Sequence, residues 1–405
     1  MRSRMKLFAF LAALVLVIAA CGDDDDGAEE TTTTAAAAPA ETTTTEAMEE
    51  TTTTAAAAEE TTTTAAAAEP AGAICEVTDT GGVDDKSFNQ LAWEGAQAVE
   101  ADLGWQARFL ESQAETDYEP NINSHVDAGD CNLIVTVGFL LGDATKTAAN
   151  ANADQQFAIV DFGYGNEVDE DGEPILDENG DPVPEIQNAN VQALVFNTHQ
   201  AAFLAGYVAA DQTQTGVIGT YGGINIGGPV TDFMEGYALG AQYYNEQKGT
   251  NVTVLGWDPA TQDGLFVGNF DSLEDGRAFA ENLNDEGADI ILPVAGPVGL
   301  GSAALAQERG FRIIGVDADW TETAPEFGDI ILTSVLKKVD VAVQDAATNV
   351  AGASTAPFLV STLESGGVGI APLTNALKDN PELAAELEAL AAAIIAGDIV
   401  TNSAG

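Results

Sequence analysis

The feature that most constrains the fold is a regular alternation of apolar runs and amphipathic segments from residue 73 onward. The runs AICEVTD at 73–79, CNLIVTVG at 131–138 and FAIVDF at 157–162 have strand length, and segments with helical periodicity lie between them. This alternation predicts βαβ units, and therefore parallel sheets covered by helices on both faces. A second alternating set begins near residue 198. The expected fold class is α/β, with two doubly wound parallel-sheet lobes.

The stretch VTDTGGVDDKSFNQLAWEG, residues 77–95, places polar groups where a small ligand is expected to bind. It reads as a buried strand, a Gly/Asp loop and the first turn of a helix, and the carboxyl end of such a strand presents free backbone N–H groups. Asp79 and Asp85 add carboxylates, Phe88 adds a ring and Asn89 adds an amide. The alternative is an ordinary glycine turn between strand and helix.

The same stretch resembles the signature of the basic membrane protein family, the nucleoside-binding lipoproteins of bacterial ABC importers. Further segments follow in the family's order and extend the resemblance over nearly all of residues 74–370. They are IVDF at 159–162, GNFDSLEDG at 268–276, PVAGPVGLG at 293–301, IIGVDADW at 313–320 and SVLKKVD at 334–340. The resemblance implies a type I periplasmic-binding-protein fold, in which two lobes joined by several chain crossings close on a ligand by hinge motion.

The resemblance also assigns roles to aromatic and polar residues of a nucleoside site. Phe88 and Phe270 are expected to stack on the two faces of a purine, because a flat base between rings gains dispersion energy with little loss of freedom. Asn89 and Asp161 are expected to face the edge of the base. Core packing of either ring, and a structural role for Asp161 at its strand end, are the alternatives.

Asp317 and Lys337 resemble the family's ribose-binding pair, because a carboxylate accepts from vicinal hydroxyls and an ammonium group donates to their oxygens. The alternative is a salt bridge between the lobes. Gly296 is expected to permit close approach of the backbone to the ligand. Asn269 and Pro297 depart from the residues usual in the family, which affects the expected ligand preference and leaves the fold unchanged.

The N-terminal 70 residues are expected to contain a signal peptide, a lipid-attachment site and a spacer. Residues 1–20 combine Arg2, Arg4 and Lys6 with a short apolar run, which is typical of a signal peptide. Residues VIAAC before Gly22 resemble a lipobox, so Cys21 is expected to carry the lipid that binds the protein to the membrane. A plain secretory signal is the alternative. The remainder of 21–70 is an acidic, low-complexity Thr/Ala segment, expected to be a disordered spacer.

Two cysteines remain in the folded part of the chain, and both lie near the start of a predicted strand. Cys75 and Cys131 belong to the first and third strands, which are parallel neighbours in a sheet of order 2-1-3. A disulfide between them is therefore expected in an exported protein, with two buried free thiols as the alternative.

The order of segments predicts how the chain is divided between the lobes. Residues 71–197 plus about 330–352 are assigned to lobe 1, and residues 198–329 plus about 353–405 to lobe 2. The segment 357–373 is expected to form a β-hairpin through its SGG turn. The acidic stretch 163–190 has Asp-x-Asn-x-Asp spacing, but it lacks the glycine and the bidentate glutamate of an EF-type calcium loop, so a solvated acidic hairpin is favoured.

Charge and missing motifs exclude other classes of function. The domain carries 52 acidic against 10 basic side chains, which argues against nucleic-acid binding. No catalytic constellation, bound metal or cofactor is expected. We expect a monomeric, non-enzymatic receptor on the outer face of the membrane, with a purine nucleoside as ligand and an ABC permease and its ATPase as separate chains. A lipoprotein that signals to a membrane partner, or a receptor for another solute such as a sugar, are the alternatives.

Overall fold

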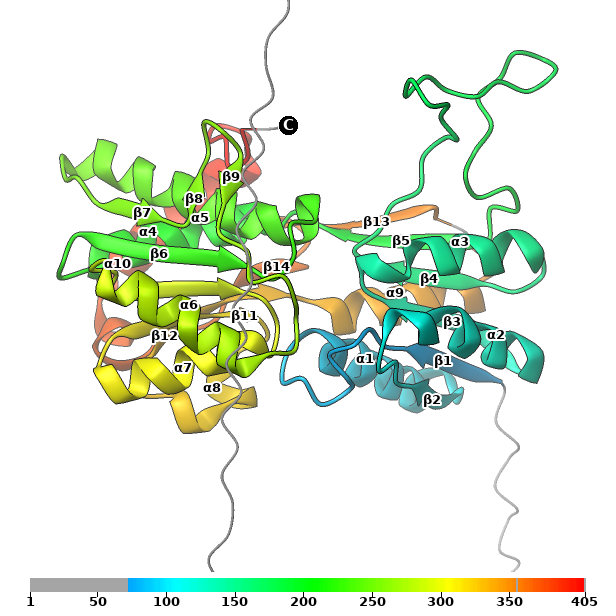
Figure 1. The fold of residues 1–405 in the computed structure, drawn as a ribbon, viewed down its shortest axis with the longest axis horizontal. Helices are drawn as coiled ribbons and strands as arrows, with labels where there is room; N and C mark the ends of the chain where they lie inside the picture. Colours follow the sequence, from blue (N-terminus) through cyan, green and yellow to red (C-terminus); the bar gives the residue numbers. More distant parts are fainter. Residues whose placement is uncertain (1–71, 355, 404–405) are drawn as a thin grey trace, which may run out of the picture. The chain divides into compact units, whose positions relative to one another are not determined.

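The computed structural model describes residues 72–354 and 356–403, which form two α/β lobes built on two six-stranded sheets (Figure 1). The predicted signal peptide, Cys21 and the spacer lie outside the described residues. Within the described part, no helix combines the length and apolar character needed to cross a membrane. The predicted fold class is confirmed.

The sheet of lobe 1 is entirely parallel, with the strand order β13-β5-β4-β3-β1-β2. Its strands are β1 (Ala73–Val77), β2 (Gln106–Leu110), β3 (Cys131–Val137), β4 (Phe157–Val160), β5 (Val191–Phe196) and β13 (Phe358–Ser361). Central strands β1, β3 and β4 are buried nearly throughout, as expected for a parallel sheet covered on both faces.

Four helices cover the lobe 1 sheet: α1 (Phe88–Leu103), α2 (Tyr118–Ala128), α3 (Gly142–Ala151) and α9 (Val339–Ala351). Helices α1 and α9 pack against each other on one face. The opposite face buries a separate apolar cluster in which α2 and α3 contribute Tyr118, Ile122 and Ala148. Helix α1 ends at Gly104, whose left-handed conformation caps the last turn.

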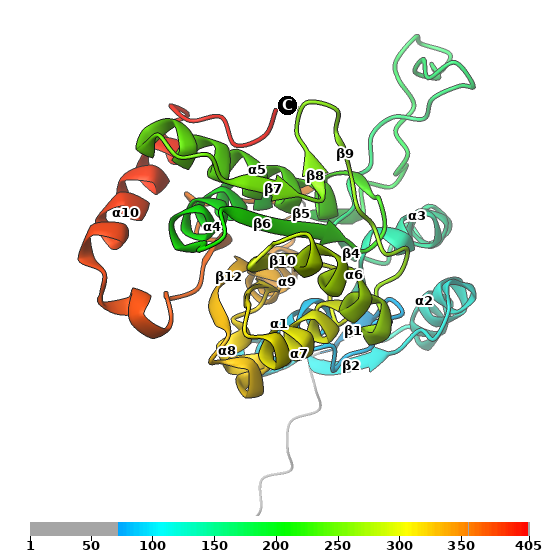
Figure 2. The ribbon, with the colours of Figure 1, turned by 60° about the vertical axis from the view of Figure 1, so that its left-hand side comes forward.

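Lobe 2 repeats this order with β14-β12-β11-β10-β6-β7. Its strands are β6 (Val217–Gly222), β7 (Thr253–Leu255), β10 (Ile290–Val294), β11 (Arg312–Asp317), β12 (Ile331–Lys337) and β14 (Val368–Ile370), and β8 (Trp257–Asp258) pairs with β9 (Asp263–Gly264) in a small hairpin. Its helices are α4 (Thr198–Gln212), α5 (Gly227–Lys248), α6 (Leu273–Asp285), α7 (Val298–Arg309), α8 (Trp320–Thr323) and α10 (Pro381–Ile395). Helices α4 and α5 pack together on one side of this sheet, and α6 and α7 on the other (Figure 2).

The chain crosses between the lobes three times: between β5 and α4, between β12 and α9, and between β13 and β14. The predicted division of the C-terminal third is wrong for two strands. Strand β12 pairs with β11 of lobe 2, and β13 pairs with β5 of lobe 1. The predicted hairpin at 357–373 is wrong for the same reason, because β13 and β14 lie in different sheets and the SGG segment is the third crossing. Apolar alternation marks a strand but does not identify its sheet.

A long excursion leaves lobe 1 between β4 and β5 (Figure 1, the green arm). Short antiparallel bridges join Asn166 to Pro184 and Leu176 to Pro182, so the stretch is a ribbon with tight turns. At one turn the Asp177 carboxylate accepts from the backbone N–H groups of Asn179 (2.8 Å) and Asp181 (2.9 Å). These bonds stabilise the charged carboxylate and lower the pKa of Asp177.

Candidate functional site

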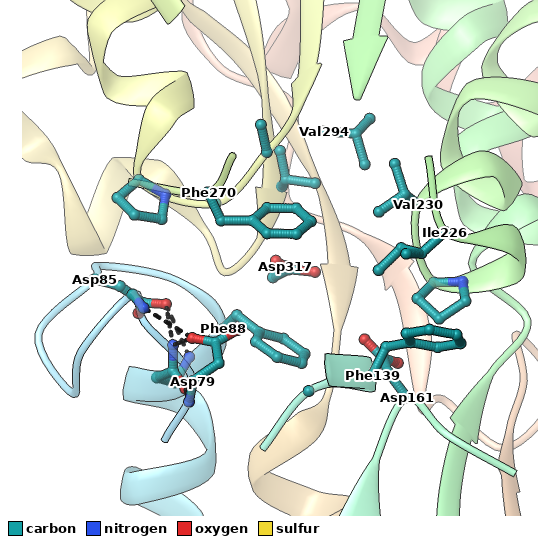
Figure 3. Close-up of a pocket in the computed structure, with 18 of the residues that line it drawn as sticks. Asp79, Asp85, Phe88, Phe139, Asp161, Ile226, Val230, Phe270, Val294 and Asp317 are labelled. Carbon is teal, nitrogen blue, oxygen red and sulfur yellow. Dashed lines mark hydrogen bonds between the residues drawn. The ribbon is translucent and has the colours of Figure 1, made fainter. Parts of the chain in front are cut away.

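A cavity lies between the two lobes, at the carboxyl ends of strands from both sheets (Figure 3). All nine residues for which the sequence predicts ligand contact line it: Asp79, Asp85, Phe88, Asn89, Asp161, Phe270, Gly296, Asp317 and Lys337. Strand ends bring them together because, in a parallel sheet, loops after the central strands share one edge. The residues therefore form one site, although up to 258 positions separate them in the sequence.

Three lobe 1 residues form a hydrogen-bonded network along one wall of the cavity. The Asn89 side-chain amide donates to Asp79 Oδ1 (2.7 Å) and to Asp85 Oδ2 (3.2 Å). The carboxylate of Asp85 also accepts from the backbone N–H groups of Ser87 (2.9 Å), Asn89 (2.9 Å) and Gln90 (3.1 Å). Asp85 therefore caps the N-terminus of α1, and its oxygens are already engaged. We interpret Asp85 as the residue that positions Asn89 and the helix.

Lys337 is deeply buried and pairs with Asp161, the residue that follows β4. The predicted ribose-binding role of Asp317 and Lys337 stays a prediction, and the ion pair of Lys337 is formed with Asp161, the carboxylate expected at the base edge. This bridge links the end of β12 in lobe 2 to lobe 1. Burial raises the pKa of Asp161, while the Lys337 charge and hydrogen bond act in the opposite direction. The interlobe salt bridge that the sequence left as an alternative is thus present, with a different acid.

Asp317, at the end of β11, is also buried and reaches lobe 1. The Ser87 hydroxyl of lobe 1 lies 3.1 Å from Asp317 Oδ2 and 3.0 Å from the Val316 carbonyl oxygen, which both belong to lobe 2. The hydroxyl hydrogen therefore makes a hydrogen bond between the lobes. Burial raises the pKa of Asp317 to about 6, and Lys337 opposes the shift. Both Asp161 and Asp317 have positive φ, 67° and 64°, a conformation that non-glycine residues seldom adopt.

Phe88 and Phe270 enter the cavity from opposite lobes, and both are half-buried (Figure 3). The Lys337 ammonium group lies 4.7 Å from the centre of the Phe88 ring. The Phe270 ring packs over the backbone of Gly223, where a Cβ atom would lie 2.1 Å from the ring. Partial exposure toward the cavity favours a ligand-contact role for both rings over core packing.

Gly296 lines the cavity, and its role in allowing close approach of the backbone to a ligand stays a prediction. It has a φ of 54°, and a Cβ atom added there would meet no described protein atom within 4 Å. The left-handed backbone conformation just after β10 favours a glycine at this position.

Sequence reasoning missed most of the apolar lining of the cavity. Phe139 follows β3, and Ile226, Pro229, Val230 and Phe233 come from the start of α5 or the loop before it. The signal was available, because Phe139 follows a strand at the same sheet edge and the segment GGINIGG follows β6. Lobe 2 thus contributes a mainly apolar wall opposite the polar network of lobe 1.

The electrostatics of the cavity favour a neutral, hydroxyl-rich ligand. Among the described lining residues, Asp79, Asp85, Asp161 and Asp317 are acidic and Lys337 is the one cation. Burial raises the pKa of Asp79, and raises that of Asp85 to about 6. Carboxylates accept hydrogen bonds from hydroxyl or amino groups, whereas a phosphate would meet several buried negative charges.

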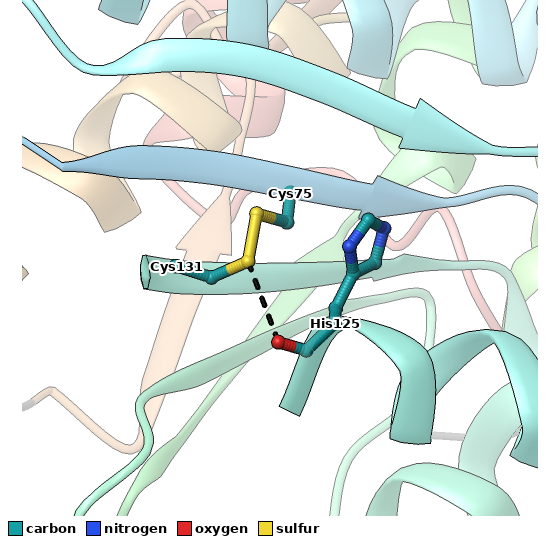
Figure 4. Close-up of side chains that lie close together, drawn as sticks. All are labelled: Cys75, His125 and Cys131. Atoms are coloured by element: carbon teal, nitrogen blue, oxygen red, sulfur yellow. Dashed lines mark hydrogen bonds between the residues drawn. A yellow bond between two sulfur atoms is a disulfide. The ribbon is translucent and has the colours of Figure 1, made fainter. Parts of the chain in front are cut away.

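Cys75 and Cys131 form a disulfide that joins β1 to β3, with 5.9 Å between the Cα atoms (Figure 4). His125 of α2 lies beside it, with Nε2 3.2 Å from the Glu76 carbonyl oxygen. Burial lowers the pKa of His125. The Cys75–His125–Cys131 group resembles a metal-ligand set, but thiolates bind metals and both sulfurs are in the disulfide. We therefore assign the group a structural role in lobe 1.

The architecture and the cleft define a solute-binding protein in which ligand is held between two α/β lobes. Residues 74–399 match the family described as ABC transporter substrate-binding protein PnrA-like, and this chain belongs to that family. Members are extracytoplasmic solute-binding components of ABC transporters and not enzymes, so a solute and a membrane permease are the partners implied.

Two curated relatives and one solved structure agree with this membership. Basic membrane protein A from Borreliella burgdorferi is 33% identical over 329 residues, covering 80% of this chain and 86% of the relative. The ABC transporter nucleoside-binding protein BmpA from Lactococcus lactis is 30% identical over 325 residues, covering 75% and 83%. A crystal structure of an ABC transporter system solute-binding protein from Aeropyrum pernix K1 is 26% identical, with a TM-score of 0.65 and coverage of 82% and 94%.

Proposed function

We propose that this protein is a lipid-anchored receptor that captures a purine nucleoside between its lobes and delivers it to an ABC permease. The base stacks between Phe88 and Phe270. Asn89 and Asp161 face the base edge, and Asp79, Asp317 and Lys337 face the ribose. A similar protein, from Lactococcus lactis, is described as nucleoside-binding, which is the same ligand class.

The observation that carries the proposal is the combination of two opposed rings with buried carboxylates in one cleft. Opposed rings select a flat apolar group, and carboxylates at their margin select a group with several hydroxyl or amino hydrogens. A nucleoside has both parts, whereas a simple sugar lacks the flat base. The acidic lining also disfavours nucleotides, because their phosphates are anionic.

Calorimetric titration of ligand-stripped protein with adenosine, guanosine, inosine and adenine tests the proposal. We expect at least one nucleoside to bind, and we expect Lys337→Met to weaken nucleosides more than adenine because its proposed partner is the ribose. Mass spectrometry of ligand released from freshly purified protein provides an independent identification. If well-folded protein binds none of these compounds and a sugar is released instead, the nucleoside assignment is wrong.

The proposed anchor is tested separately in cells. Replacing Cys21 by serine removes the sulfur that accepts the lipid, so the protein should move from the detergent phase to the aqueous phase in Triton X-114 separation. Thr31→Ser provides a control, because it changes a residue after Cys21 and leaves all three cysteines in place. Equal partitioning of Cys21→Ser and wild type would contradict the anchor.

A further inference from the structure

The start of α5 forms part of the cavity wall, but its own sequence supports a helix only weakly there. Pro229, Val230 and Phe233 lie in its first two turns and line the cavity. The helix begins with Gly227 and Gly228, which are both exposed, and no side chain caps its N-terminus. Glycine is an unfavourable residue in a helix, and a first turn without a cap leaves backbone N–H groups unsatisfied. Contacts with other parts of the chain are therefore needed to fix this wall.

Residues 396–403, which follow α10, make such contacts from outside the cavity. Figure 2 shows this segment, in red, running from α10 past α5. The side-chain amide of Asn402 donates to Asp232 Oδ1 (2.9 Å). The backbone N–H of Ser403 donates to Glu235 Oε1 (3.1 Å), and the Ser403 hydroxyl donates to the same oxygen. The segment is thus hydrogen-bonded to the same turns of α5 that form the cavity wall.

The Glu235 carboxylate connects this segment to a further part of lobe 2. Glu235 is 2% exposed, and its Oε2 accepts from Trp257 Nε1 (2.6 Å) and Gln262 Nε2 (3.1 Å) of the β8–β9 hairpin. Among the residues that the structure describes, its Oε1 accepts hydrogen bonds from Ser403 alone. A buried carboxylate oxygen without a partner is costly, so the contact with Ser403 is strongly favoured in the folded protein.

The later turns of α5 are fixed in a different way. A Cβ atom added to Gly236 or Gly240 would lie 2.2 Å from the His199 carbonyl oxygen or 2.0 Å from that of Phe203, so the backbones of α4 and α5 are in close contact there. The Thr401 hydroxyl also reaches α4, where it lies 2.7 Å from His199 Nδ1. The glycine contacts begin at Gly236, whereas the contacts of residues 402 and 403 act on the turns before it.

We propose that Asn402 and Ser403 are positioning residues for ligand binding, which fix the start of α5 in the geometry of the cavity wall without touching the ligand. A wall that is already ordered loses little freedom when a ligand binds, so these contacts raise the affinity. The inference goes beyond the proposed function, and it rests on that function only for the choice of adenosine as the test ligand.

The double variant Asn402→Ala/Ser403→Ala of the full-length protein tests the proposal. It removes both side-chain hydrogen bonds and keeps the backbone bond to Glu235, so the buried carboxylate retains a partner. We expect the Kd for adenosine, measured by calorimetry, to rise about 10-fold. In ligand-free protein, amide hydrogen exchange should accelerate in residues 227–235 and stay unchanged in residues 298–309 of α7.

Two further variants separate positioning from general stability. Asn284→Ala is the matched control, because its amide also makes a 2.9 Å hydrogen bond in lobe 2, to the Ala288 carbonyl oxygen, outside the cavity. It should change neither the Kd for adenosine nor the exchange of residues 227–235. Ser403→Thr keeps the hydroxyl group and should bind adenosine as the wild type does. A merely structural role of residues 402 and 403 would lower the melting temperature of the double variant and leave its affinity unchanged.

The possible outcomes also separate this proposal from the nucleoside assignment. Unchanged exchange in residues 227–235 of the double variant overturns the proposal, whatever the ligand is. Faster exchange with an unchanged affinity for adenosine overturns it as well. If the wild type does not bind adenosine, the nucleoside assignment fails, and the amount of ligand released from freshly purified protein replaces the titration. The double variant should then release less ligand than the wild type, and equal amounts would contradict the proposal.

Discussion

The two lobes share one topology but contribute different chemistry to the cleft. In both sheets the central strands end at the cavity, and Asp161 after β4 corresponds in the strand order to Asp317 at the end of β11, each with positive φ. Lobe 1 adds the hydrogen-bonded network of Asp79, Asp85 and Asn89. Lobe 2 adds an apolar wall at the start of α5 and the Lys337 cation.

The difference shows that topology fixes where functional residues lie, while the loops after the strands decide what they do. Corresponding strand ends supply a carboxylate in each lobe, and hydrogen bonds or ion pairs then give each carboxylate a separate role. Asp161 joins the lobes through Lys337, and Asp317 joins them through Ser87. Closure of the cleft is therefore stabilised by polar contacts at both strand ends.

The largest effect on stability is expected from Lys337. This buried cation pairs with Asp161 of lobe 1 and interacts electrostatically with Asp317 of lobe 2. Lys337→Met leaves Asp161 buried without its partner, so the free energy of unfolding should fall by about 3–5 kcal/mol at pH 7. Chemical denaturation of ligand-free protein measures this change. Lys378→Met removes an exposed lysine and should have little effect. Equal losses in the two variants would contradict the importance of the buried pair.

Loss of the disulfide should destabilise lobe 1 more than lobe 2, because both cysteines lie in lobe 1. Replacing both Cys75 and Cys131 by alanine releases a loop with a sequence separation of 56 and should cost about 2–4 kcal/mol. Hydrogen exchange should accelerate at β1 and β3 more than at β6 and β10 of lobe 2. Equal acceleration in both lobes, or none, would show that the bond does not stabilise lobe 1 selectively.

The fold class and the residues that line the cavity were largely predictable from the sequence. The ion pairs between those residues and the sheet to which each strand belongs were not. Strand ends can be read from apolar runs, and the family resemblance then implied that Asp79, Asp161 and Asp317 share one cleft. The ion pair of Lys337 depends on how two lobes pack, which no local pattern encodes. The same limit explains the wrong sheets for β12 and β13, because a short apolar strand pairs equally well with either edge.

Asp317 should make the stability of the protein depend on pH. Its pKa in the folded state, about 6, lies above the usual value of 3.8, so its stabilising protonated form is lost as pH rises through 6. The stability of Asp317→Asn relative to wild type should therefore increase by about 2–3 kcal/mol between pH 4 and pH 7. Denaturant unfolding of ligand-free protein across this range measures the change.

Two comparisons control the pH experiment. Asp263→Asn, an exposed substitution in β9, should leave the pH slope unchanged. Asp85→Asn should show a pH-dependent change of the same sign, because burial raises the pKa of Asp85 to about 6 as well. It should also lose stability at every pH, because an amide nitrogen cannot accept the backbone N–H groups at the start of α1. A wild-type slope in Asp317→Asn would show that another group titrates in this range.

Removing the two aromatic rings one at a time tests how much each lobe contributes to the affinity for the ligand. Phe88→Ala and Phe270→Ala should each weaken adenosine binding by about 1–3 kcal/mol, the range for base–aromatic stacking. Phe88→Ala should also lower the melting temperature more, because it removes a ring 4.7 Å from the buried Lys337 cation. Phe109→Ala, a partly exposed ring outside the cavity, is the control. If affinity is unchanged while stability falls by about 3–5 kcal/mol, the substituted ring belongs to its lobe's core and does not contact the base.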